Sequence, residues 1–258
     1  MSGTRSAATK APATDRASVS ATLVIAVHGI RGQAGCAVDH AKRIAGNGRF
    51  GDVRVACLKG TPSLSEVFAD LAGRDIVLAP LLMADGYTLK AMRRQLDPIT
   101  PTLRSLTIAP PLGVHPGLAE LIVETATDIC RTRGWPPART DLVIAAHGTR
   151  RDPNSGKSAF DHVETIRARR IFAAVRTGFL DQAPMLAEIT AASRACQVVV
   201  GLFIDRGEHG EEDIPAILGE VDPAAVYTGP IGADPRITDL LLDQIDSVLT
   251  DMSVALRP

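Results

Sequence analysis

A nearly identical nonapeptide occurs twice in the chain, as LVIAVHGIR at residues 23–31 and as LVIAAHGTR at residues 142–150. In each copy an apolar run typical of a buried strand leads directly into a histidine and a glycine. Ligands of open α/β sheets bind just beyond the carboxyl ends of the strands. His28 and His147 are therefore expected to face a cleft. For a single copy, a histidine that only caps a turn would be an equal alternative, but the duplication favours a site.

Other landmarks repeat at almost the same separation, between 119 residues (28 to 147) and 122 residues (40 to 162). In order along the chain they are Asp39–His40 with Asp161–His162, Pro62 with Pro184, Gly86 with Gly207, Gly113 with Gly232, and Pro116 with Pro235. Landmarks that keep their order over the whole length indicate an internal duplication rather than chance.

Apolar runs alternate with segments of helical periodicity, and Gly and Pro separate them. We expect strands at 21–27, 53–57, 75–82, 104–110, 142–146, 171–175, 197–204 and 224–230. Helices are expected at 37–46, at 62–73, near 160–170, near 213–218 and at 235–249. Three more are expected with one end defined: a short helix that ends at about 96, a long helix that begins near 116, and a helix that begins at 184. The predicted fold class is α/β, with two similar βαβαβαβα lobes, each built on a four-stranded, mostly parallel sheet, and a cleft between them. The expected domains are a disordered tail (1–20), an N-terminal lobe (21–134) and a C-terminal lobe (135–258), with a linker at 133–141.

Composition excludes several classes of protein. The net charge is −1 and gives no electrostatic case for a nucleic-acid partner. No apolar run approaches the roughly 20 residues that cross a bilayer. The four cysteines are scattered without a CxxC pair, which suits a reducing, cytoplasmic compartment. Because the duplication is already fused in one chain, we expect a monomer.

The second half has a further histidine where its third strand is expected to end, in GLFIDRGEHGEEDIP (201–215). His147 and His209 then follow two strands of one sheet and face one crevice. Two imidazoles with few other ligands suit Fe, Co, Ni or Zn in an open site. Asp181, after the second strand of this half, is a candidate carboxylate. The alternative for His209 alone is an exposed loop histidine among acidic residues.

The strings HGTR, FLDQAP, LFIDRGEHGEEDIP and YTGPIGADPR resemble the class II chelatases, in particular the CbiX/SirB-type sirohydrochlorin chelatases. The resemblance covers about residues 22–250. It implies two lobes around a tetrapyrrole, insertion of Co²⁺ or Fe²⁺ into sirohydrochlorin in cobalamin or siroheme biosynthesis, and metal binding by His147 and His209. Asp181 stands where glutamate is more usual, and we expect these three residues to be catalytic. The metal, which could also be Ni²⁺, is a substrate, and no nucleotide is needed.

The first half departs from this pattern. His28 is kept. When the two halves are aligned without gaps, however, Thr88, beside Tyr87, matches His209, and Lys59 falls in the region of the carboxylate. We therefore expect the metal site in the second half. Guanidinium groups pair well with the carboxylates of such a macrocycle. The expected substrate-binding residues are His28, Arg31, Tyr87, Arg150, Arg151 and Arg206, although each arginine could equally be a solvated surface charge.

Three other functions compete with this one. The HG segment also occurs in α/β-hydrolases, but the chain has no GxSxG nucleophile motif. The loop GIRGQAG is rich in glycine but does not have the GxGxxG spacing of dinucleotide-binding folds. A protein that binds metal or tetrapyrrole without catalysis is the remaining alternative, and only turnover separates it from an enzyme.

Overall fold

The computed structural model describes residues 19–150 and 152–255, so Arg151 and most of the predicted tail lie outside the described residues. Eight strands form two four-stranded sheets in which every pairing is parallel. The first sheet has the order β2-β1-β3-β4 and the second the order β6-β5-β7-β8. The strands are β1 (Val19–Val27), β2 (Phe50–Cys57), β3 (Asp75–Pro80), β4 (Ser105–Ile108), β5 (Thr140–Ala146), β6 (Ala174–Phe179), β7 (Cys196–Gly201) and β8 (Val226–Pro230). The predicted α/β fold with two similar lobes is confirmed.

A helix follows each strand. The helices are α1 (Ala37–Gly46), α2 (Leu64–Phe68), α3 (Tyr87–Leu96), α4 (Gly117–Arg133), α5 (Lys157–Arg167), α6 (Leu186–Ala191), α7 (Ile214–Val221) and α8 (Ile237–Ala255). The central strands β1 and β5 are buried along almost their whole length, which explains their continuous apolar sequences. Both run directly into the histidines of the repeated nonapeptide.

Some element boundaries differ from the predicted ones. The strand predicted at 171–175 lies instead at Ala174–Phe179, because β6 is an edge strand that tolerates polar residues. Within it, the Arg176 guanidinium pairs with Asp141 and the Thr177 hydroxyl donates to the Ile144 carbonyl. The helix predicted at 62–73 is only Leu64–Phe68, with Ser63 and Glu66 forming a capping box at its start.

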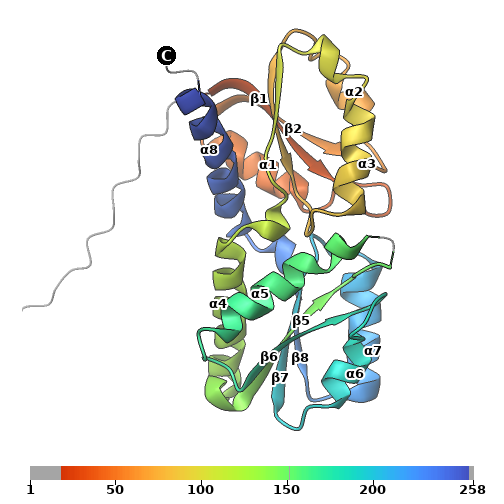
Figure 1. Ribbon diagram of the computed structural model, residues 1–258, viewed down its shortest axis with the longest axis vertical. Helices are drawn as coiled ribbons and strands as arrows, with labels where there is room; N and C mark the ends of the chain where they lie inside the picture. Colours follow the sequence, from red (N-terminus) through yellow and green to blue (C-terminus); the bar gives the residue numbers. More distant parts are fainter. Residues whose placement is uncertain (1–18, 151, 256–258) are drawn as a thin grey trace, which may run out of the picture.

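The last helix of each half packs on the lobe of the other half. Helix α4, from the first half, contacts α5, β7 and β8, whereas α8, from the second half, contacts α1 and β3. Figure 1 shows α4 beside α5 in the lower lobe and α8 beside α1 in the upper lobe. The buried residues of α1, α4, α5 and α8 belong to one apolar cluster that runs through both lobes. The lobes are thus joined by a continuous core rather than by a linker alone.

Two buried histidines at equivalent positions, one in each lobe, hold the chain just before each exchanged helix. His40 on α1 donates from Nε2 to the Gly232 carbonyl at 2.9 Å, just before α8. His162 on α5 makes the equivalent bond to the Gly113 carbonyl at 2.8 Å, just before α4. A side chain at either glycine would collide with the backbone of the loop after the third strand, at Met83 or Ile204, which explains why glycine stands at both positions.

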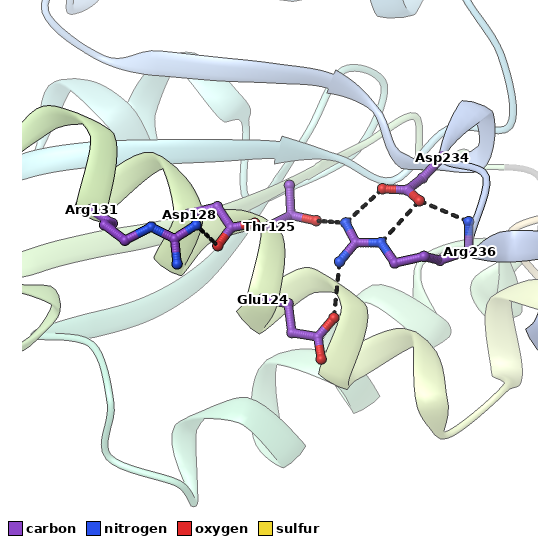
Figure 2. A network of polar contacts seen from close by, with 6 residues as sticks. All are labelled: Glu124, Thr125, Asp128, Arg131, Asp234 and Arg236. Atoms are coloured by element: carbon purple, nitrogen blue, oxygen red, sulfur yellow. Dashed lines mark hydrogen bonds and ion pairs between the residues drawn. The ribbon is translucent and has the colours of Figure 1, made fainter. Parts of the chain in front are cut away.

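The exchanged helices also meet one another. Arg236, immediately before α8, pairs with Glu124 of α4 at 2.9 Å and with Asp234 at 2.7 Å. Figure 2 shows its guanidinium lying between Asp234 and helix α4.

Over the described residues, no helix is long and apolar enough to span a membrane.

Candidate metal-binding site between the lobes

The carboxyl ends of the two sheets face a common cavity of about 560 Å³, which lies in the range of small-molecule sites. The first lobe contributes His28 after β1 and the start of α3, including Tyr87 and Thr88. The second lobe contributes His147 after β5, Asp181 after β6 and His209 after β7. The cleft predicted between the lobes is therefore present, and the predicted catalytic side chains all line it.

His147 and His209 lie against each other in this cavity. Their ring centroids are 4.4 Å apart and the rings are nearly perpendicular, at 82°. His147 Nδ1 is 2.7 Å from the Gly148 carbonyl and His209 Nδ1 is 2.6 Å from a carboxylate oxygen of Asp213. Both partners are acceptors, so each Nδ1 donates a hydrogen bond and each Nε2 is left without a partner in these two contacts. This arrangement is typical of metal-binding histidines, whose second nitrogen is held by a carbonyl or carboxylate.

His209 lies in an unusual helical turn. Residues His209–Asp213 form a π-helix that continues into α7. The π-helix is rare and often marks functional sites. Here it places His209 and Asp213, four residues apart, in hydrogen-bonding contact. The acidic residues next to the histidine thus include its own orienting partner.

Asp181 occupies the position that Lys59 occupies in the first lobe. The Asp181 amide donates to the His147 carbonyl at 3.0 Å, and the Lys59 amide donates to the His28 carbonyl at 2.8 Å. Within the described residues, no group of three or more His, Cys, Asp or Glu side chains converges to hold a metal. Asp181 therefore lines the cavity together with the two imidazoles but does not converge with them on one point.

His28 stands on the opposite wall, in the first lobe. Burial, together with the nearby Lys59 ammonium, lowers the pKa of His28 and so favours the neutral imidazole. Thr88 takes the place of a partner histidine, as the repeat predicts, and Tyr87 beside it is half exposed at 50%. This wall offers one imidazole and apolar surface from Leu82, rather than a pair of metal donors.

The predicted arginines do not line the cavity, among those that the structure describes. Arg31 pairs with Glu212 of the second lobe at 2.6 Å, and Arg206 lies 3.7 Å from Glu211. Arg150 is exposed in the loop after His147, and Arg151 lies outside the described residues. Arg31, Arg150 and Arg206 are exposed side chains that reach the cavity only by reorienting.

Sequence reasoning assigned no role to Asp213 and Glu212. The signal for Asp213 was present, because a carboxylate four residues after a histidine lies within reach on a helical turn. The contact between Glu212 and Arg31 spans 181 residues, and nothing in the local pattern could reveal it. The same holds for Lys90, which crosses between the lobes to the buried carboxylate of Asp152 at 2.7 Å.

Two α/β lobes with two adjacent imidazoles facing the cleft between them are the arrangement expected of a metal chelatase. The sequence profile of the CbiX family matches residues 22–129 and 141–248, one match for each half. The chain therefore belongs to the CbiX family. The two matches also confirm the internal duplication.

Curated relatives agree with this membership. A probable sirohydrochlorin cobaltochelatase of Halobacterium salinarum is 29% identical over 262 residues, covering 86% of this chain and 89% of the relative. A sirohydrochlorin cobaltochelatase of Methanopyrus kandleri is 29% identical over 140 residues, which span 42% of this chain but 96% of the relative. The second relative thus has the length of one half of the chain.

Solved structures show the same fold. The structure of CbiX, described as the terminal enzyme for biosynthesis of siroheme in denitrifying bacteria, covers 88% of this chain and 98% of its own, with a TM-score of 0.74 and 26% identity. SirB from Bacillus subtilis with Fe³⁺ covers 91% of this chain and 98% of its own, with a TM-score of 0.75 at 14% identity.

Proposed function

We propose that this protein inserts Co²⁺ or Fe²⁺ into sirohydrochlorin without a nucleotide, as a cytoplasmic, monomeric enzyme of cobalamin or siroheme biosynthesis. The observation that carries the proposal is the pair of imidazoles, His147 and His209, whose free Nε2 atoms share one cavity between two chelatase lobes. Family membership and relatives named sirohydrochlorin cobaltochelatase support the same substrate.

The site suits a metal that must arrive and leave. Two imidazoles bind Co²⁺, Fe²⁺ or Ni²⁺ and leave further coordination positions for water or for ring nitrogens. A closed set of four protein ligands would retain the ion instead. His147 and His209 therefore take up the substrate metal and present it to the macrocycle from the side of the second lobe.

Insertion exchanges one divalent ion for two pyrrolic protons of the ring. Asp181 lies on the same side as the histidine pair and His28 on the opposite wall, and both line the cavity. The lowered pKa of His28 favours the neutral imidazole, the form whose ring nitrogen is free to accept a proton. We assign Asp181 and His28 as proton acceptors, with Tyr87 and His28 also contacting the macrocycle.

The carboxylates of the tetrapyrrole need cations at the mouth of the cavity. Arg150 and Arg206 are exposed and close in sequence to the two metal-binding histidines, and they serve this purpose, although Arg206 also lies 3.7 Å from Glu211. Arg151, the next residue in the sequence after Arg150, is a further candidate. Arg31 already has Glu212 as a partner. A substrate contact by Arg31 therefore requires that this ion pair open.

Absorbance spectroscopy of purified protein with sirohydrochlorin and Co²⁺, Fe²⁺ or Ni²⁺ in turn tests the function. The expected result is conversion of the metal-free spectrum into the metallated one over many turnovers per protein molecule, with no nucleotide added. Stoichiometric binding without turnover would instead identify a protein that only binds metal or tetrapyrrole.

A further inference from the structure

The segment that carries His209 is held by the other lobe at several points. The Asp205 carboxylate accepts a hydrogen bond from the Cys36 amide at 2.5 Å. The Cys36 thiol donates to the Ile204 carbonyl at 3.2 Å. Burial, as the main cause, and the Asp205 charge, as the second, raise the pKa of this thiol to about 12, so it stays protonated and can donate. Further along, Arg31 pairs with Glu212 at 2.6 Å. The first lobe thus contacts both ends of the segment 204–213.

Arg31 is presented on a rigid turn of the first lobe. Ile30 and Gln33 exchange backbone hydrogen bonds of 2.8 Å in both directions, and the Thr61 amide donates to the Gly32 carbonyl at 3.0 Å. Arg31 and Gly32 have φ angles of +48° and +76°, as a tight two-residue hairpin requires. A non-glycine residue seldom adopts such a φ. The backbone hydrogen bonds of the turn therefore fix the position of the Arg31 Cα atom, from which the side chain extends.

Glu212 is next to the residue that orients the metal-binding histidine. Glu212 and Asp213 both belong to the five-residue π-helix that starts at His209, and Asp213 accepts the Nδ1 proton of that histidine. A shift of Glu212 is therefore passed to Asp213 and to the imidazole within one turn. Metal–ligand distances tolerate only about 0.2 Å, so a small shift separates the two Nε2 atoms from a common ion.

We propose that Arg31 and Glu212 are positioning residues, through which the first lobe holds His209 in register with His147. The inference rests on the proposed function, in which both imidazoles take up the metal. It gives the first lobe, which lacks a donor pair of its own, a definite part in metal capture. It also differs from a contact between Arg31 and the substrate, because Arg31 then acts on the metal site in the absence of tetrapyrrole.

Calorimetric titration of the full chain with Co²⁺ alone tests the proposal. Arg31→Glu adds negative charge near the cavity, so electrostatic attraction alone would strengthen Co²⁺ binding. Positioning predicts the opposite, a loss of about fivefold, which is the upper range for an exposed ion pair. The double variant Arg31→Glu with Glu212→Arg restores the pair in reverse and should recover most of the affinity.

Arg131→Glu is the matched control. Arg131 pairs with Asp128 on α4 at 2.9 Å (Figure 2). The side-chain exposures are 76% and 53% for this pair, against 71% and 60% for Arg31 and Glu212. This variant should leave Co²⁺ affinity unchanged. Unchanged or tighter binding by Arg31→Glu, failure of the double variant to recover, or an equal loss in Arg131→Glu would each overturn the proposal.

Insertion kinetics on the same variants separate this inference from the proposed function. Positioning predicts a higher KM for the metal with an unchanged KM for sirohydrochlorin. A raised KM for sirohydrochlorin with normal Co²⁺ affinity would return Arg31 to a substrate contact and overturn the proposal. If the wild-type protein binds Co²⁺ but forms no metallated product, the proposed function fails, while the titration still decides whether Arg31 positions His209.

Discussion

At the scale of single residues, the proposed metal site depends on which nitrogen of each imidazole is free to bind an ion. His147 and His209 reach this state by different means, one through a backbone carbonyl and the other through the Asp213 carboxylate. The carbonyl cannot be removed by substitution, but the carboxylate can. Asp213 is therefore the most informative side chain to change outside the proposed metal-binding pair.

Asp213→Ala should weaken Co²⁺ binding by roughly 10- to 100-fold, because removing an orienting partner frees the ring and lowers its basicity. Asp213→Asn keeps an acceptor for Nδ1 and should lose less. Calorimetric titration with Co²⁺ measures both, and Asp128→Ala, which removes an exposed carboxylate on α4, is the control. Wild-type affinity in Asp213→Ala would show that His209 needs no orienting partner.

Among the helices and strands, the buried histidine pair that fixes the helix exchange makes stability depend on pH. Burial is the main cause of the lowered pKa values of His40 and His162. The unfolded chain therefore takes up protons below a pH of about 6.5 that the folded protein resists. The free energy of unfolding should fall as the pH is lowered below about 6.5. The contribution of the two neutral histidines to stability should be complete above that pH.

Urea unfolding at pH 7.5 and pH 5.5 measures this dependence. His162→Leu should lose about 1–3 kcal/mol at pH 7.5, because the buried Gly113 carbonyl is left without its donor. The variant should also show a smaller drop on acidification than the wild type, since one titrating group is gone. An identical drop in both proteins would remove His162 from the explanation.

Elements with an unambiguous pattern could be predicted from the sequence. Helix α1 has the predicted bounds, 37–46, because its small apolar residues recur at helical spacing. Strand β6 was misplaced because its Arg176 and Thr177 find partners only in the neighbouring strand. The duplication and the resemblance point to the residues of the proposed metal site, whereas Asp213 and Glu212 depend on contacts made after folding.

For the whole molecule, the exchange of α4 and α8 could not be read from the sequence. Each repeat ends in a helix of suitable length and periodicity, and the sequence alone does not reveal which sheet that helix covers. The structure places α4 on the second lobe and α8 on the first. Each half therefore lacks one of the helices that cover its own sheet.

Neither half, 19–134 or 135–255, should fold alone as a monomer, because each would expose the surface that the other half's helix covers. The expected outcome is an unfolded chain or a dimer in which two copies exchange the helix, while co-expression of both halves restores a folded complex. Size-exclusion chromatography and cooperative unfolding measure this. A monomeric half with cooperative unfolding would contradict the role given to the exchange.

The central claim is that the second lobe alone supplies the metal donors, although both halves carry the same histidine motif. Co²⁺ titration of His147→Ala beside His28→Ala tests it most directly. The account predicts a loss of at least about tenfold in affinity for His147→Ala, since a ligand matters no less than its outer-shell partner. His28→Ala should keep wild-type Co²⁺ affinity and lose turnover with sirohydrochlorin. An equal loss of Co²⁺ affinity in the two variants would show instead that the metal is shared across the lobes.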